Sequence, residues 1–384
     1  MDLHFSQEAE AWRKEVRDFL DADLPPEKEF ETEFDEDDGR WNFALAFSKK
    51  VGAKKWTCLS WPKQYGGLER PFVYETIFRD EFAYRSAPLV NSTGLGLAAG
   101  TLLNFGSEKQ KREHLPAIAS MKTLWAEGFS EPNAGSDLAS LQTRAELQAS
   151  GDWLVNGQKT YITWAHRCDV LYLAARTDPN VPKHKGISIF CMPLRAKGVT
   201  MQALMNIGGG RQNHIFIENV RLPADAIIGE PNQGWRYITN ALWGGAPSGT
   251  EWARYKRAFD DLVTFCRHTG LSKDPIVRDK LVDLAMGFEV LKLLEYEEIW
   301  RLEQQLEPAF AGSIGVLFMK EFNTRFANIT SEILGASGLF LEGKGAVLKG
   351  RLAELYVRSY GNHAGGTPQT KRMVLATRGL GLPR

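Results

Sequence analysis

The sequence predicts an α+β protein of several domains, in the order helical, β, helical. A length of 384 residues is too great for one ordinary core and suits two or three domains. Apolar residues recur at helical spacing at both ends of the chain, whereas the middle carries short strand-like runs. We therefore expect an N-terminal α-helical domain at residues 1–122, a middle β domain at 123–230 and a C-terminal helical bundle at 231–384.

The N-terminal domain is predicted from a series of amphipathic segments. Ser6 is placed to cap a first helix, and Pro25 with Pro26 ends it. Eight acidic residues at 27–38 indicate a solvated loop. The apolar positions that recur at three- and four-residue spacing in the first helix are Ala9, Trp12, Val16, Phe19 and Leu20. Further helical segments are expected at 41–51, 71–84 and 108–120.

The middle domain is predicted from turn signals and short apolar runs. Asn156-Gly157 lies between two strand-like runs in residues 152–163 and predicts a β-hairpin there. Because several short strands follow one another without helical spacing, we expect a small antiparallel barrel or sandwich. Its further strands are expected at 170–175, 186–192 and 214–220.

The C-terminal domain is predicted from three long helical segments, at 277–303, 316–334 and 346–357, with Gly-rich turns at 335–345. Long antiparallel helices joined by short loops form a bundle. The first segment carries an apolar stripe made of Leu281, Leu284, Phe288, Leu291 and Leu294.

Composition excludes several classes of protein. Lys and Arg total 47, as do Asp and Glu, so a net charge of +0 offers no overall field for nucleic acid or anionic lipid. No apolar run approaches the roughly 18 residues that span a bilayer, and the charged first turns lack a signal core. Four scattered cysteines indicate reduced thiols, and the histidines form no metal-ligand cluster. We expect a cytoplasmic protein without a metal or a membrane span.

Two segments point to chemistry. Residues 129–140 combine hydroxyl side chains with a Pro-led turn and a Gly-Ser step, where the chain enters the β region. Turn amides and a Ser hydroxyl can contact a phosphate or the edge of a heterocycle without bringing a formal charge. Alone this segment indicates only a turn. The polar run at 156–163 lies at about the separation that a β domain needs to bring the two segments together, and we expect them to converge, which makes the signal more specific.

These two segments resemble the signature stretches of the acyl-CoA dehydrogenase superfamily. Ser130-Glu-Pro-Asn-Ala-Gly-Ser-Asp137 is similar to its TEPxAGSD run, and Asn156–Thr163 to its NGxKxWIT run. The resemblance covers nearly the whole chain, including residues 61–67, 332–338 and 365–384. It implies an α-helical domain, an antiparallel β-barrel domain and a C-terminal four-helix bundle.

The resemblance also implies FAD. By position, Phe129, Ser130 and Ser136 would line the flavin and its pyrophosphate, and Thr163 would bond near flavin N5. Tyr161 stands where the family usually has Trp and would cover the ring face. Ser136 and Gly365 would also meet the substrate. The positions that meet the AMP half of the cofactor, some of them across a subunit boundary, are Glu332, Gly335, Thr367 and Gln369.

In the family reaction a carboxylate removes the α-proton of an acyl-CoA thioester and the β-hydrogen leaves as hydride to flavin N5. The resemblance thus implies an acyl-CoA substrate, an electron-transfer flavoprotein or similar acceptor, and a homotetramer, homodimer or heteromer with a related subunit. The base is missing here: Gly365 and Gly245 occupy its two usual positions, and Glu251 lies off the helical face of Gly245.

Three interpretations follow. The first is a dehydrogenase whose base is another residue or belongs to a related subunit. The second is a flavoprotein of the same fold whose reaction on an acyl-CoA needs no base. The third is a subunit that binds FAD or CoA without catalysis.

Overall fold

The computed structural model describes residues 5–25, 37–207, 210–243, 252–306, 310–359 and 365–383. The chain forms two compact units, each discontinuous in sequence. The first unit contains Met1–Glu31, Pro71–Pro88 and Pro247–Arg384, and the second contains Thr32–Arg70 and Leu89–Ala246. Predicted residues 26–36, 245 and 251 lie outside the described residues, and the domain boundaries at 122 and 230 stay a prediction.

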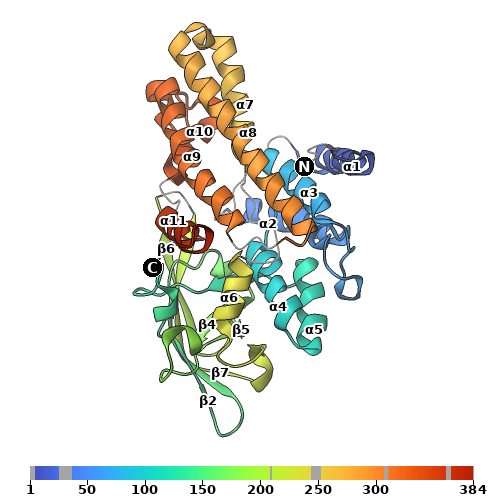
Figure 1. The fold of residues 1–384 in the computed structure, drawn as a ribbon, viewed down its shortest axis with the longest axis vertical. Helices are drawn as coiled ribbons and strands as arrows, with labels where there is room; N and C mark the ends of the chain where they lie inside the picture. The colour runs from blue at the N-terminus through green and yellow to red at the C-terminus, as the bar shows by residue number, and fades with distance from the viewer. Residues whose placement is uncertain are drawn as a thin grey trace. The chain divides into compact units, whose positions relative to one another are not determined.

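The first unit is helical (Figure 1). The predicted N-terminal helix is confirmed: the amide of Ala9 donates to the Ser6 hydroxyl at 3.2 Å, and the five predicted apolar side chains are buried. Residues from α7, α8, α9 and α10 share one hydrophobic core, centred on Phe288, Phe322 and Phe326. The helices are α1 (Gln7–Asp23), α3 (Phe72–Tyr84), α7 (Trp252–Thr269), α8 (Pro275–Glu303), α9 (Ala311–Leu334), α10 (Arg351–Ser359) and α11 (Pro368–Val374).

The helix expected at 346–357 begins only at Arg351, so this part of the prediction is wrong. Leu348 and Lys349 have φ of 51° and 57°, and Gly350 has φ of 74°. A run of left-handed residues cannot continue a right-handed helix. The sequence gives no sign of it, because Leu and Lys are good helix formers.

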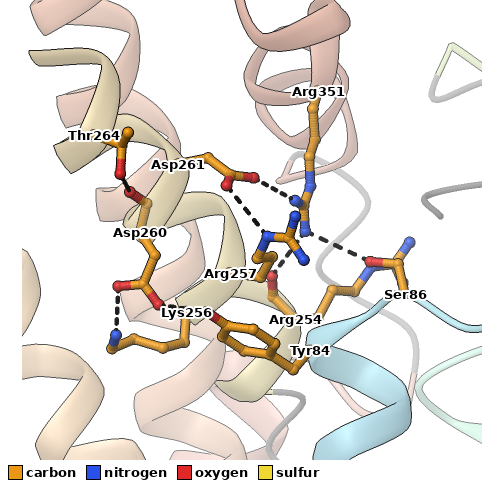
Figure 2. Close-up of polar contacts among 9 residues, drawn as sticks. All are labelled: Tyr84, Ser86, Arg254, Lys256, Arg257, Asp260, Asp261, Thr264 and Arg351. Carbon is orange, nitrogen blue, oxygen red and sulfur yellow. Dashed lines mark hydrogen bonds and ion pairs between the residues drawn. The ribbon is translucent and has the colours of Figure 1, made fainter. Parts of the chain in front are cut away.

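A buried arginine ties α10 to α7 and to the end of α3 (Figure 2). The Arg351 guanidinium donates to Asp261 Oδ2 at 3.0 Å and to the Arg254 carbonyl at 3.2 Å. Arg257 contacts the other Asp261 oxygen, and the Tyr84 hydroxyl donates to Asp260 at 3.0 Å. Burial lowers the pKa of Arg351 to about 10, although Asp261 opposes this change.

The second unit contains the sheet and the remaining helices (Figure 1). The helices are α2 (Asp38–Ala53), α4 (Ala99–Phe105), α5 (Glu108–Ala119) and α6 (Gly234–Trp243). The strands are β1 (Trp125–Gly128), β2 (Arg144–Leu147), β3 (Trp153–Lys159), β4 (Val170–Arg176), β5 (Ile187–Pro193), β6 (Val199–Met205), β7 (Arg211–Leu222) and β8 (Ile227–Ile228).

The described strands form one open sheet in the order β6-β7-β3-β2-β4-β5-β8, with β1 beside β4, so the expectation of a closed antiparallel barrel is wrong. Both β1 and β2 run parallel to β4. The β2–β4 junction is a single residue pair, Arg144 with Arg176. At the β2–β4 junction only one residue pair joins the two strands, and β6 and β8 have no described strand on their outer sides. The strands therefore do not close into a barrel.

Each face of β4 packs on a separate core. On one face, Leu171 and Leu173 lie against residues of β3, β5 and β7, so the two halves of the sheet enclose this core. On the other face, Tyr172 and Ala174 pack with β1 and with residues of α4, α5 and α6. This second face, covered by helices, is called the helical face below. Strand β1 therefore contributes its side chains to two different environments.

The predicted turn at Asn156-Gly157 is wrong: both residues lie inside β3. The register against β7 shifts between Val155 and Gly157, as at a β-bulge. Gly157 has φ of 151°, and a Cβ there would lie 2.6 Å from the Thr143 hydroxyl oxygen. Glycine is needed for this close approach of β2 and β3 rather than for a turn.

None of the helices in the described part of the chain is both long enough and apolar enough to cross a bilayer.

Candidate active site

The first signature segment forms a tight loop after β1. The Glu131 amide donates to the Ala134 carbonyl at 3.0 Å, and the Ala134 amide returns a bond to the Glu131 carbonyl at 3.1 Å. Ala134 is buried under this loop, whereas Gly135 and Ser136 are exposed. A Cβ at Gly135 would meet no atom within 4 Å, so there is open space beside these backbone amides.

The two signature segments meet. The Thr160 amide, directly after β3, donates to the Ser130 carbonyl at 2.9 Å. The Lys159 ammonium donates to the Phe129 carbonyl at 3.0 Å. The expected convergence of the loop at 130–136 with the run at 156–163 is therefore present, held by one backbone bond and by the Lys159 side chain.

Beneath this junction lies a buried ion pair. Lys159 Nζ is 2.8 Å from Glu131 Oε1, and both side chains are nearly inaccessible to water. The same carboxylate accepts the Gln142 amide at 2.7 Å and the Thr143 amide at 2.9 Å. Burial lowers the pKa of Lys159 to about 8, with Glu131 opposing this. Burial alone would raise the pKa of Glu131, but Lys159 and the two amides outweigh it and lower that pKa.

The segment after the junction is fixed against β7. The Ile162 amide donates to the Asn213 carbonyl at 3.0 Å, and the Asn213 side chain donates to the Ile162 carbonyl at 3.0 Å. Thr163, which is half-buried, has a long 3.5 Å contact from Gln212. Tyr161 has φ of 60° and is 60% exposed, so its ring stands away from the protein core. An unusual backbone conformation at an exposed aromatic is common at binding sites.

The other predicted site residues lie in the first unit, on α9 and α11, which pack on each other. Glu332 pairs with Lys280 at 2.7 Å, so its charge is balanced within the chain. Gly335 ends α9 with φ of 58°. The Thr367 hydroxyl caps α11 by accepting the Thr370 amide at 3.1 Å, and Gln369 is exposed.

Three family models together match almost the whole chain. They describe the N-terminal, middle and C-terminal domains of acyl-CoA dehydrogenase and match residues 6–122, 126–220 and 232–380. The chain belongs to the acyl-CoA dehydrogenase family. It is therefore an acyl-CoA dehydrogenase-like oxidoreductase, as the resemblance of its signature segments predicts.

Among curated relatives, acyl-CoA dehydrogenase IpdE1 of Mycolicibacterium smegmatis is 31% identical over 352 residues, covering 88% of each chain. Among solved structures, the Tcur3481-Tcur3483 steroid ACAD is 30% identical with a TM-score of 0.91, covering 100% of both chains. The ChsE4-ChsE5 complex from Mycobacterium tuberculosis is 29% identical with a TM-score of 0.91, also covering 100% of both chains.

Of the two positions at which the resemblance places the base, the structure describes one. Gly365 is exposed, has φ of 69°, and a Cβ there would meet no atom within 4 Å. The position offers a backbone N–H and open space but no acid. The other position, Gly245, lies outside the described residues.

Sequence reasoning missed the residues that build the junction. Lys159 and Glu131 belong to the signature runs, but the sequence does not show that they pair and anchor both segments. The position of Lys159 at the end of a short strand, within the second signature run, was the available signal of a buried cation. Glu127, on the strand that leads into the loop, was also missed.

Proposed function

We propose that this chain binds FAD and uses it to oxidise an acyl-CoA thioester to the 2,3-enoyl-CoA, passing the electrons to an electron-transfer flavoprotein or similar acceptor in the cytoplasm. The observation that carries the proposal is the junction of the two signature segments, the Thr160 amide on the Ser130 carbonyl at 2.9 Å. This bond supports the proposal because it joins the two segments whose residues would surround the flavin.

The residues at the junction fit a flavin. The Thr160 hydroxyl is buried and has no partner among the described residues, so it is free to bond a ligand. Within the same described part of the chain, the hydroxyls of Ser130, Ser136 and Tyr161 also make no hydrogen bond. The exposed Tyr161 ring supplies aromatic surface for a planar heterocycle. When bound, the flavin would accept a hydride from the β-carbon.

The AMP half of FAD would be held by Glu332, Gly335, Thr367 and Gln369. The pairing of Glu332 with Lys280 supports this assignment, because it reduces the repulsion that an isolated carboxylate would exert on a phosphate. Ser136 and the Gly365 N–H would hold the thioester side of the substrate. An N–H aimed at the thioester oxygen stabilises the enolate-like charge that develops there.

We expect FAD bound to the purified protein to lose its visible absorbance on anaerobic mixing with an acyl-CoA panel, with an enoyl-CoA detected by mass spectrometry. Product formed without loss of absorbance would favour a reaction that needs no base. A colourless protein that takes up no added FAD, alone or with a co-purifying subunit, would contradict the proposal.

A second candidate function is a subunit that binds FAD or CoA without catalysis in a heteromeric dehydrogenase. The open, acid-free position at Gly365 favours it. The similarity to the ChsE4-ChsE5 complex agrees with it.

A face of α8 supports association with a second family chain, identical or related. An apolar stripe on this helix is exposed at four-, four- and three-residue spacing, with Met286 58% exposed. Exposed apolar stripes of this kind mark subunit interfaces. Its members are Val282, Met286, Val290, Leu293 and Trp300.

We expect Met286→Glu together with Val290→Glu to weaken this association about tenfold or more, because two charges would be buried in an apolar contact. Native mass at several protein concentrations measures the effect. Arg267→Glu, at an exposed position of α7, is the control and should leave the assembly unchanged. An assembly of unchanged mass in the double variant would contradict this role of α8.

A further inference from the structure

Glu127 projects from β1 onto the same face of the sheet as Phe129. Side chains alternate along a strand, and both Trp125 and Phe129 belong to the core on the helical face. Glu127 pairs in register with Tyr172 of β4, whose ring lies 5.5 Å from the ring of Phe129. The Glu127 carboxyl therefore lies beside an aromatic wall that includes a predicted flavin contact.

This carboxyl has no hydrogen bond or ion pair with any described residue, although its side chain is only partly accessible. Burial raises the pKa of Glu127 to about 7. Glu131, four residues later, differs in this respect, because its carboxylate pairs with a lysine and accepts hydrogen bonds from two backbone amides. A buried structural carboxylate is normally satisfied in that way, whereas an unsatisfied one is typical of a functional site.

The placement of Glu127 suits the reacting end of the substrate. Phe129 lies two positions further along the chain than Glu127, a spacing of about 6.6 Å in extended backbone. Phe129 also forms part of the junction through its bond from Lys159. Meanwhile the exposed position at Gly365 carries no acid, so the family reaction needs a carboxylate from elsewhere.

We propose that Glu127 is the carboxylate that accepts the α-proton of the acyl-CoA thioester. This inference rests on the proposed function. In the step, the Cα–H bond breaks, the proton forms an O–H bond on a Glu127 oxygen, and the electron pair stays on the substrate as the thioester enolate. Glu127 as a whole residue is partly accessible, unlike its neighbours Trp125 and Phe129, which are buried.

Three other titratable groups lie close to Glu127 on the helical face: Tyr172, Cys191 and His114. Burial raises the pKa of the Tyr172 phenol and of the Cys191 thiol, and Glu113 adds to the effect on Cys191. Burial lowers the pKa of His114, whose ring packs on Trp125. Tyr172, Cys191 and His114 are thus neutral near pH 7, where Glu127 titrates. Because the base must be ionised, proton abstraction by the free protein should rise with pH through about 7.

The test uses the FAD-loaded protein with any co-purifying subunit. Butanoyl-CoA, octanoyl-CoA and a steroid-ring acyl-CoA are incubated in D₂O without oxygen, and deuterium at the α-carbon is measured by mass spectrometry. We expect Glu127→Gln to slow exchange about 10²- to 10⁴-fold and Glu127→Asp to retain part of it. Glu146→Gln, an exposed glutamate on β2, is the matched control and should exchange at the wild-type rate.

A second readout does not depend on activity. Infrared difference spectra should show a protonated carboxyl band that titrates near pH 7 in the wild type and is absent from Glu127→Gln. FAD content and thermal unfolding confirm that the variant is folded and loaded. If Glu127→Gln exchanges the α-proton within about twofold of the wild-type rate, the role of Glu127 is contradicted while the proposed function stands. The same holds if the wild-type protein binds FAD and acyl-CoA but exchanges no α-proton. Wild-type protein that binds neither would overturn the proposed function as well.

Discussion

Introducing Gly365→Glu into the Glu127→Gln protein is expected to restore α-proton exchange at least about tenfold, because a carboxylate then occupies the position where many family members carry their base. The backbone leaves room for it, since a Cβ at residue 365 meets no atom within 4 Å. The φ of 69° is unfavourable for a residue other than glycine, so we also expect a loss of about 1–2 kcal/mol in unfolding free energy.

Gly365→Gln in the Glu127→Gln protein distinguishes the effect of the added carboxylate from the effect of the strained backbone. It imposes the same left-handed conformation and a similar volume but cannot accept the proton. Exchange is measured by deuterium incorporation, and unfolding by urea titration. If the Glu and Gln variants exchange equally slowly while both bind FAD and acyl-CoA, residue 365 does not face the α-carbon in this chain.

The helices were predictable because their apolar positions repeat along one face. In α1 the five predicted residues are the ones that the structure buries, and Ser6 is its cap. This periodicity is local, so the sequence of the helix itself is enough to predict the helix. The start of α10 was not predictable, because Leu348 and Lys349 take left-handed conformations that their own helix propensities oppose.

The sheet was harder to predict because its geometry depends on partners far away in sequence. Asn156-Gly157 has the composition of a hairpin turn, yet it lies at a bulge inside β3, where Thr143, just before β2, approaches the Gly157 backbone closely. The signature segments were found by resemblance, and their meeting was an expectation that the Thr160 to Ser130 bond confirms.

Glu127 could not be predicted as a special residue because one glutamate in a strand of four residues gives no periodic signal. Only the pairing of β1 with β4 shows that it shares a face with Trp125 and Phe129. For Gly365 the family resemblance predicts the role of the position, and the structure adds its left-handed backbone and its open surroundings.

Lys159→Met is expected to lower the unfolding free energy by about 3–5 kcal/mol, because it leaves the Glu131 carboxylate buried without its cation. The amides of Gln142 and Thr143 still reach that carboxylate, but they do not neutralise its charge. The same substitution removes the bond to the Phe129 carbonyl, so retention of FAD should weaken together with stability. Urea unfolding and the FAD content after gel filtration measure the two effects.

A double-mutant cycle distinguishes the charge from simple loss of packing. Lys159→Met with Glu131→Gln removes both charges, so the double variant should recover part of the stability lost by Lys159→Met, with a coupling of about 1–3 kcal/mol. Lys183, which pairs with Asp137 at 2.7 Å on the surface of the same unit, provides the control. Lys183→Met should change stability by less than about 1 kcal/mol, because water already solvates that pair. Equal losses for Lys159→Met and Lys183→Met would mean that the buried pair does not hold the junction together.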